Sequence, residues 1–143
     1  MKTCITILCF AFTITALGQS AVGKWVTIDD KTGKKKSIVE LYKKDKKLYG
    51  KIIYLYPEKG REDNPKCTKC TDYRKNKPLI GMPIVLGLKW NGSEWEGGTI
   101  LDPENGKVYK VSIWIDSEND DALKVRGYIG FLFRTQNWYR IKK

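Results

Sequence analysis

The feature that most constrains this chain is a repeated alternation of apolar and polar residues, interrupted by turn residues about every ten positions. Spacing typical of helices is much rarer. The turns include Asn91-Gly92 and the segment from Asp102 to Gly106, both of which favour tight hairpins. The alternation predicts eight strands, at residues 22–28, 36–42, 47–56, 81–90, 95–101, 108–115, 123–129 and 133–141.

Eight sequential strands joined mostly by short turns fit a closed, antiparallel, up-and-down β-barrel, because closure leaves no strand edge unpaired. We therefore predict an all-β, eight-stranded barrel, formed as a single domain by residues 19–143. The interior of such a barrel is just wide enough for packed side chains or for one small ligand. The pattern leaves both alternatives open, since they differ only in how much volume the side chains fill.

The first 18 residues have the pattern of a cleaved signal peptide. Lys2 precedes an apolar run at residues 5–17, and small residues at 16–18 place the cut before Gln19. The run is shorter than the roughly 20 apolar residues that a membrane-spanning helix needs. We therefore predict export, with Cys4 and Cys9 discarded and only Cys67 and Cys70 retained.

The net charge of +11 is concentrated in one region of the chain. Residues 31–77 contain 16 Lys or Arg against 6 Asp or Glu, whereas residues 78–143 contain 9 against 8. This basic region could form a positive face for anionic lipid, acidic glycans or cell-wall polymers. A Lys-rich surface that only keeps the protein soluble is the alternative.

Cys67 and Cys70 lie in a long polar loop, at about residues 58–80. In an oxidising compartment we expect them to form a disulfide that stabilises this loop. Thiol exchange and metal binding remain alternatives. A thioredoxin-like motif needs a strand-to-helix setting, and a tetrahedral metal site needs four ligands in a chain without His. No metal and no cofactor is predicted.

The absence of His also excludes Ser-His and Cys-His nucleophile pairs. Glu94 and Glu96 share one face of a predicted strand and resemble a glycosidase pair, but same-face neighbours lie about 7 Å apart. Most other acidic residues cluster at turns, where solvated capping is their expected role. We assign no catalytic residue, and the sequence favours a protein that is not an enzyme.

On residues 133–141, Arg134, Gln136, Trp138 and Arg140 share one face; both faces of this strand are mixed, so parity alone does not say which one points inward. On residues 123–129, Leu123, Val125 and Ile129 oppose Lys124, Arg126 and Tyr128. If the first set is core, Arg126 and Tyr128 face water. The side chains that we nominate for a polar or anionic group in the cavity are Lys89, Tyr109, Arg126, Tyr128, Arg134 and Gln136.

The tripeptide Gly23-Lys24-Trp25 opens the first strand, and Arg140 ends the last one. This arrangement resembles that of the calycins, the lipocalins and their relatives, in which such an Arg packs over such a Trp and closes the barrel floor. A guanidinium on an indole ring contributes roughly 0.5–2 kcal/mol. The residues to which we assign structural roles are Trp25, Trp138, Arg140, Asp102 and Gly106.

A second resemblance covers nearly the whole chain after the leader. It is carried in order by Gly87-Leu88-Lys89, Trp95-x-Gly97-Gly98-x-Ile100-x-Asp102-Pro103, Gly106-Lys107-x-Tyr109, Val125-Arg126-Gly127-Tyr128-x-Gly130 and Arg134-Thr135-Gln136-x-Trp138-x-Arg140. These elements resemble the secreted bacterial family filed as domain of unknown function 2147. The resemblance implies a bacterial envelope protein, periplasmic or extracellular, and no particular reaction. The chain departs from it at Phe133, where members often have Gly, and in the Cys-x-x-Cys loop, which only some members have.

The best hypothesis from the sequence is noncatalytic binding of a small amphipathic or anionic molecule in the cell envelope. The first alternative is a surface module that binds anionic lipid or polymer through residues 31–77, with possible contact to a membrane surface. The second is a redox or metal accessory protein that uses Cys67 and Cys70. Nucleic acid is disfavoured because the protein is expected to be exported. We expect a monomer or a weak oligomer.

Overall fold

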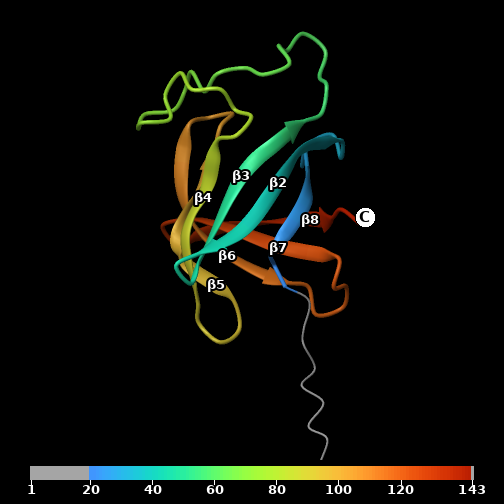
Figure 1. The fold of residues 1–143 in the computed structure, drawn as a ribbon, viewed down its shortest axis with the longest axis vertical. Coiled ribbons are helices and arrows are strands. Elements are labelled where there is room, and N and C mark those ends of the chain that lie inside the picture. Colours follow the sequence, from blue (N-terminus) through green and yellow to red (C-terminus); the bar gives the residue numbers. More distant parts are fainter. Residues whose placement is uncertain (1–19, 143) are drawn as a thin grey trace, which may run out of the picture.

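The computed structural model describes residues 20–142, which form a closed antiparallel barrel (Figure 1). Each strand pairs with the next, and β8 returns to pair with β1. The strands are β1 (Gly23–Ile28), β2 (Lys35–Lys44), β3 (Lys47–Leu55), β4 (Pro83–Trp90), β5 (Trp95–Asp102), β6 (Lys107–Ile115), β7 (Ala122–Ile129) and β8 (Leu132–Arg140).

The predicted fold class is confirmed, and every predicted strand lies within two residues of an observed one at each end. Residues 20–142 include no helix that is long and apolar enough to cross a membrane. The predicted signal peptide, residues 1–18, lies outside the described residues.

The barrel closes where β1 meets β8, at the pairs Trp25–Arg140 and Val26–Tyr139. The Trp25 side chain is fully buried, and the Arg140 guanidinium carbon lies 4.3 Å from the centre of its ring. Arg140 Nη2 also donates a hydrogen bond to the Ser20 carbonyl at 2.8 Å. Gly23 has a φ of 142°, and a Cβ there would lie 3.3 Å from Arg140 Nη1. Glycine therefore lets the arginine approach the tryptophan.

Around this pair the barrel is filled with side chains. Alternate residues of the strands point inward, as the period of two requires. We call this end of the barrel the sealed half. Its fully buried side chains include Trp25, Val39, Leu41, Leu48, Leu88, Ile113 and Leu123.

The long β3–β4 loop lies at the opposite end of the molecule from the β4–β5 turn (Figure 1). The predicted disulfide is confirmed, since Cys67 and Cys70 are joined, and both residues are buried. The loop also packs against the turn that precedes β6. Gly106 in that turn has a φ of 73°, and a Cβ there would lie only 1.8 Å from the Lys69 carbonyl oxygen. Only glycine permits this contact.

A buried arginine attaches the same loop to β4. Arg74 is 3% exposed, and its Nη1 donates to the Pro83 carbonyl at 3.0 Å. Its Nη2 lies 2.6 Å from Asp72 Oδ2. Hydrogen bonds from the Arg74 side chain and backbone hold the pKa of the Asp72 carboxyl below its usual range. The loop is thus tied to the barrel by Arg74 and by the close approach at Gly106, and the disulfide cross-links the loop within itself.

Candidate functional site

The end of the barrel away from the Trp25–Arg140 pair is hollow. A cavity of about 910 Å³ opens between the β1–β2 turn, the β3–β4 loop, the β5–β6 turn and the β7–β8 hairpin. We call this end the open half. Trp138 lines its inner end and belongs to the buried core as well. Much of the remaining wall is apolar and is formed by Ile52, Leu55, Leu79, Ile84, Ile100, Leu101 and Val125.

A line of polar contacts runs from this inner end to the mouth along β8. Trp138 Nε1 donates to Gln136 Oε1 at 3.4 Å, and Gln136 Nε2 donates to Asp30 Oδ2 at 2.9 Å. Asp30 also forms an ion pair with Arg134. On the neighbouring strands, the buried hydroxyls of Thr27 and Ser37 lie 2.7 Å apart and face the same cavity. The cavity thus offers a few converging polar groups within an apolar wall.

The mouth of the cavity carries charges of both signs in equal number, and several of them are paired. Lys36 Nζ lies 2.6 Å from Glu104 Oε1, in addition to the Arg134–Asp30 pair. Hydrogen bonds from the Thr32 backbone and hydroxyl are the main reason that the pKa of the Asp29 carboxyl is lowered. The rim is therefore formally neutral. Its acidic members are Asp29, Asp30, Glu58, Asp102 and Glu104, and its basic members are Lys31, Lys36, Arg61, Lys66 and Arg134.

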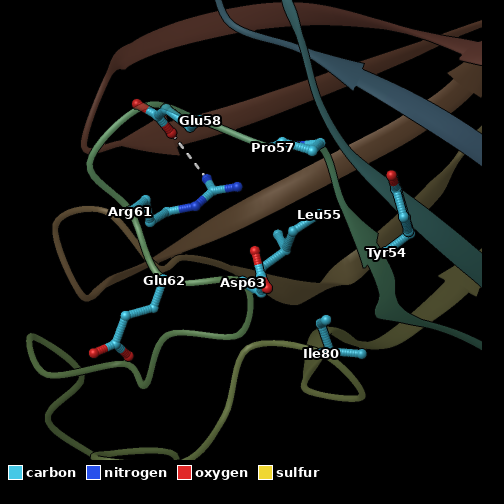
Figure 2. Close-up of a pocket in the computed structure, with 8 residues that line it drawn as sticks. All are labelled: Tyr54, Leu55, Pro57, Glu58, Arg61, Glu62, Asp63 and Ile80. Atoms are coloured by element: carbon cyan, nitrogen blue, oxygen red, sulfur yellow. Dashed lines mark hydrogen bonds and ion pairs between the residues drawn. The ribbon is translucent and has the colours of Figure 1, made fainter.

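A smaller pocket of about 270 Å³ lies beside the mouth, between the end of β3 and the start of the β3–β4 loop. Figure 2 shows Arg61 turned back towards Glu58. Arg61 Nη1 lies 2.9 Å from Glu58 Oε2. Leu55, Glu58 and Arg61 line both this pocket and the large cavity. The Glu58–Arg61 pair therefore stands between the two spaces.

Three of the nominated binding residues line the cavity, namely Tyr109, Arg134 and Gln136. Asp102 lines it too, and Asp102 Oδ1 accepts from the Glu104 backbone N–H at 3.0 Å within the β5–β6 turn. The Tyr109 hydroxyl accepts from Asn105 Nδ2 at 2.9 Å, which holds the phenol at the same turn.

The other three nominated residues lie outside the cavity, which corrects their expected placement. On β7, Val125, Gly127 and Ile129 face the cavity, so the period of two turns Arg126 and Tyr128 outward. Arg126 Nε donates to Thr135 Oγ1 at 2.8 Å on the outer surface. Lys89 is exposed and lies near the end of β4, towards the sealed half. In the sheet it is the register partner of Glu96 on β5.

Several cavity residues were missed at the sequence level. The inward orientation of Thr27 could have been predicted, because Thr27 follows Trp25 by two positions on β1 and so points to the same face. Asp30 and Arg61 had no comparable signal, because they lie in a turn and in a loop whose path only the folded chain defines. Asp30 is held at the mouth by Gln136 and Arg134, which are distant in the sequence, whereas Arg61 is held by Glu58 and the Tyr56 carbonyl of its own segment.

The basic region at residues 31–77 includes an outer surface of β2 and β3 on which lysines lie over aromatic rings. Lys51 Nζ is 5.5 Å from the centre of the Tyr42 ring, and Tyr42 stacks on Tyr49 with ring centres 6.0 Å apart. Lys43, which shares the parity of the buried Leu41, lies on the other side of β2 at the strand end, with its Nζ 5.8 Å from the centre of the Trp95 ring of β5. These lysines are thus partly engaged by the protein's own aromatic side chains.

The buried disulfide leaves neither Cys67 nor Cys70 as a free thiol. Within residues 20–142, no group of three or more His, Cys, Asp or Glu side chains gathers as metal ligands would. The converging groups in the cavity are hydroxyls, an amide and paired charges, which are suited to holding a molecule in place.

Comparison with known proteins agrees with the fold. The model of the family described as "Uncharacterized protein conserved in bacteria (DUF2147)" matches residues 23–140, which confirms the resemblance seen in the sequence. A solved structure, described as protein HP1028 from the human pathogen Helicobacter pylori and as belonging to the lipocalin family, is similar with a TM-score of 0.72 and 21% identity. The match covers 87% of this chain and 84% of that one. No curated protein matches the sequence.

Proposed function

Because the chain belongs to this bacterial family and folds as a lipocalin-like barrel, we propose that it binds a small amphipathic molecule in the cavity of the open half. It holds this molecule without transforming it. The apolar part of the ligand lies against the inner wall, and its polar or anionic group lies among the charges of the mouth.

The cavity itself carries the proposal. Its volume of about 910 Å³ falls within the roughly 300–1,000 Å³ that is typical of small-molecule sites. Burial of apolar surface against its wall contributes about 25 cal/mol per Å². At the rim, the ion pairs Lys36–Glu104, Arg61–Glu58 and Arg134–Asp30 can be exchanged for contacts with the ligand. A purely apolar molecule would leave these charges unused.

Location in the bacterial envelope is part of the same proposal. The leader at residues 1–18 and the Cys67–Cys70 disulfide support it, because disulfides persist in oxidising compartments.

The direct test is to fill the cavity from its wall. Gly127 faces the cavity, and a Cβ there would meet only the Tyr109 Cβ, at 3.8 Å. Gly127→Phe therefore places a ring inside the cavity without a backbone clash. Lys89→Phe is the matched control, because it adds the same ring to an exposed position of β4. Titration with a dansyl-labelled fatty acid should show saturable binding to the wild type and to Lys89→Phe, and at least tenfold weaker binding to Gly127→Phe.

The same titration separates the cavity from the basic surface. Binding inside the barrel should be insensitive to moderate salt, whereas binding to the lysine-rich surface of β2 and β3 should weaken steeply as salt rises. Binding that Gly127→Phe leaves intact and that salt abolishes would contradict cavity binding and favour the surface module. Native mass spectrometry of protein from its own host should then identify the bound molecule by its mass.

The redox alternative has less support. Thiol exchange requires an accessible sulfur, and both cysteines of this loop are 1% exposed. Alkylation of the native protein tests the point, because two freely modified thiols would contradict the disulfide.

A further inference from the structure

The tip of the β7–β8 hairpin is the most exposed apolar feature among the described residues. Gly130 and Phe131 form the turn between the paired residues Ile129 and Leu132. Phe131 is 94% exposed, and Ile129, Leu132 and Phe133 are each more than half exposed. We call these four side chains the apolar tip. Four large apolar side chains at one convex turn need a partner that covers them.

The tip lies at the mouth of the cavity. Ile129, Leu132 and Phe133 line the cavity, whereas Phe131 does not. An apolar medium that covered the tip would therefore be continuous with the apolar wall of the open half.

The strands that lead to the tip carry only cations, whereas the acidic side chains of the cavity mouth belong to other segments. Strands β6, β7 and β8 contain six Lys or Arg and no Asp or Glu, and two of the six, Lys124 and Arg140, lie at the far end beside the β6–β7 turn. Lys110 pairs with Tyr128 next to the tip, Lys107 begins the adjacent strand, and the Arg126 guanidinium lies 4.4 Å from the centre of the Phe133 ring. Acidic residues of the β6–β7 turn, from Asp116 to Asp121, lie at the other end of these strands. A negatively charged surface would attract the tip and repel the opposite end.

From these observations we propose that the apolar tip docks on an anionic lipid bilayer, inserting Phe131 and Leu132 while Lys107, Lys110 and Arg126 contact lipid headgroups. A bilayer accepts a small convex apolar tip beside cations, as amphipathic surface anchors do. A stable dimer would bury about 800 Å² on each copy, which is more than one hairpin tip supplies. The inference does not rest on the cavity being occupied.

The test compares two substitutions that change the charge equally. Phe131→Asp removes the most exposed apolar side chain of the tip, and Trp90→Asp removes an exposed aromatic side chain at the other end of the barrel. Both variants should fold, because Phe131 is almost fully exposed and Trp90 is half exposed. Sedimentation with vesicles of phosphatidylcholine and phosphatidylglycerol in equal parts should show binding of the wild type and of Trp90→Asp. Phe131→Asp should bind at least about tenfold more weakly, the loss expected for one buried Phe.

Three outcomes would overturn the inference. The first is that the wild type does not bind these vesicles, and the second is that both variants lose affinity equally, as a general charge effect would require. The third is that Phe131→Asp abolishes a concentration-dependent dimer and leaves vesicle binding intact. Gly127→Phe should keep vesicle binding, and Phe131→Asp should keep binding of the dansyl-labelled fatty acid. Failure of tip docking is thereby distinguishable from failure of cavity binding.

Discussion

The two halves of the barrel each place an arginine of β8 at the end of the barrel, one over packed side chains and one at the mouth of a cavity. In the sealed half, Arg140 covers the fully buried Trp25 ring, and packed apolar side chains fill the interior. In the open half, Arg134 on the same strand and the same face reaches a rim of paired charges around a cavity of about 910 Å³. Strand β8 thus carries one arginine that closes the barrel and one that borders its opening.

The difference shows how one strand pattern can supply both stability and a space for binding. Dense packing gains dispersion and burial energy, so the sealed half should carry most of the stability. The open half loses such contacts, and its β3–β4 loop compensates in part, because the disulfide cross-links the loop and Arg74 anchors it to β4. Substitutions in the two halves should therefore have effects of different size.

The largest effect is expected from Trp25→Ala. Truncation of a buried aromatic costs about 3–5 kcal/mol, which urea unfolding should show as a lower midpoint with an unchanged slope. Trp90→Ala is the control, because that ring is half exposed and should lose only about 1 kcal/mol from its contact with Trp95. A nearly unchanged midpoint for Trp25→Ala would contradict its role in closing the barrel.

An intermediate effect is expected from the double substitution of Cys67 and Cys70 by Ser. Opening a ring of so few residues costs about 2 kcal/mol in the chain-entropy model. Urea unfolding of this variant, compared with the oxidised wild type, measures the loss. Equal stability of the two proteins would show that the remaining loop contacts, including those of Arg74, are sufficient by themselves.

A smaller effect distinguishes the two arginines of β8 directly. Arg140→Met should cost about 1 kcal/mol, because it removes the contact with the Trp25 ring and the hydrogen bond to the Ser20 carbonyl. Arg134→Met removes an exposed ion pair with Asp30 and should cost no more than about 0.5 kcal/mol. If the two variants unfold at the same urea concentration, the halves do not differ as described.

The smallest effect concerns acid. The pKa of Asp72 is lowered in the folded state by its hydrogen bonds with Arg74, so its contribution to stability is fully present above its pKa in the unfolded chain. That contribution is lost as the pH falls through the lowered pKa. Unfolding measured across this acid range should therefore be less pH-dependent in Asp72→Asn than in the wild type. An identical pH profile would contradict a role for the Asp72–Arg74 contact in stability.

The site could be only partly predicted from the sequence. Arg134 and Gln136 were nominated because they share a face with Trp138, and that face does point inward. Arg126 and Tyr128 were nominated as well, but they share a parity with Lys124, whereas Val125 and Gly127 line the cavity. Both faces of β8 mix polar and apolar residues, so periodicity could not rank them, whereas on β7 the alternation already sets Leu123, Val125 and Ile129 against Arg126 and Tyr128. The burial of Leu123 and Val125 decides the orientation of β7.

The amino-acid sequence by itself determined the strands, their order and the closure of the sheet, because period-two alternation and turn chemistry are local properties of the chain. It also placed Trp25 and Arg140 at the two ends that meet. Only the tertiary structure decided that one half is hollow, that Asp30 and Arg61 border it, and that the apolar tip lies at its mouth. A cavity is volume that side chains from distant segments leave unfilled, and no local pattern reports that volume.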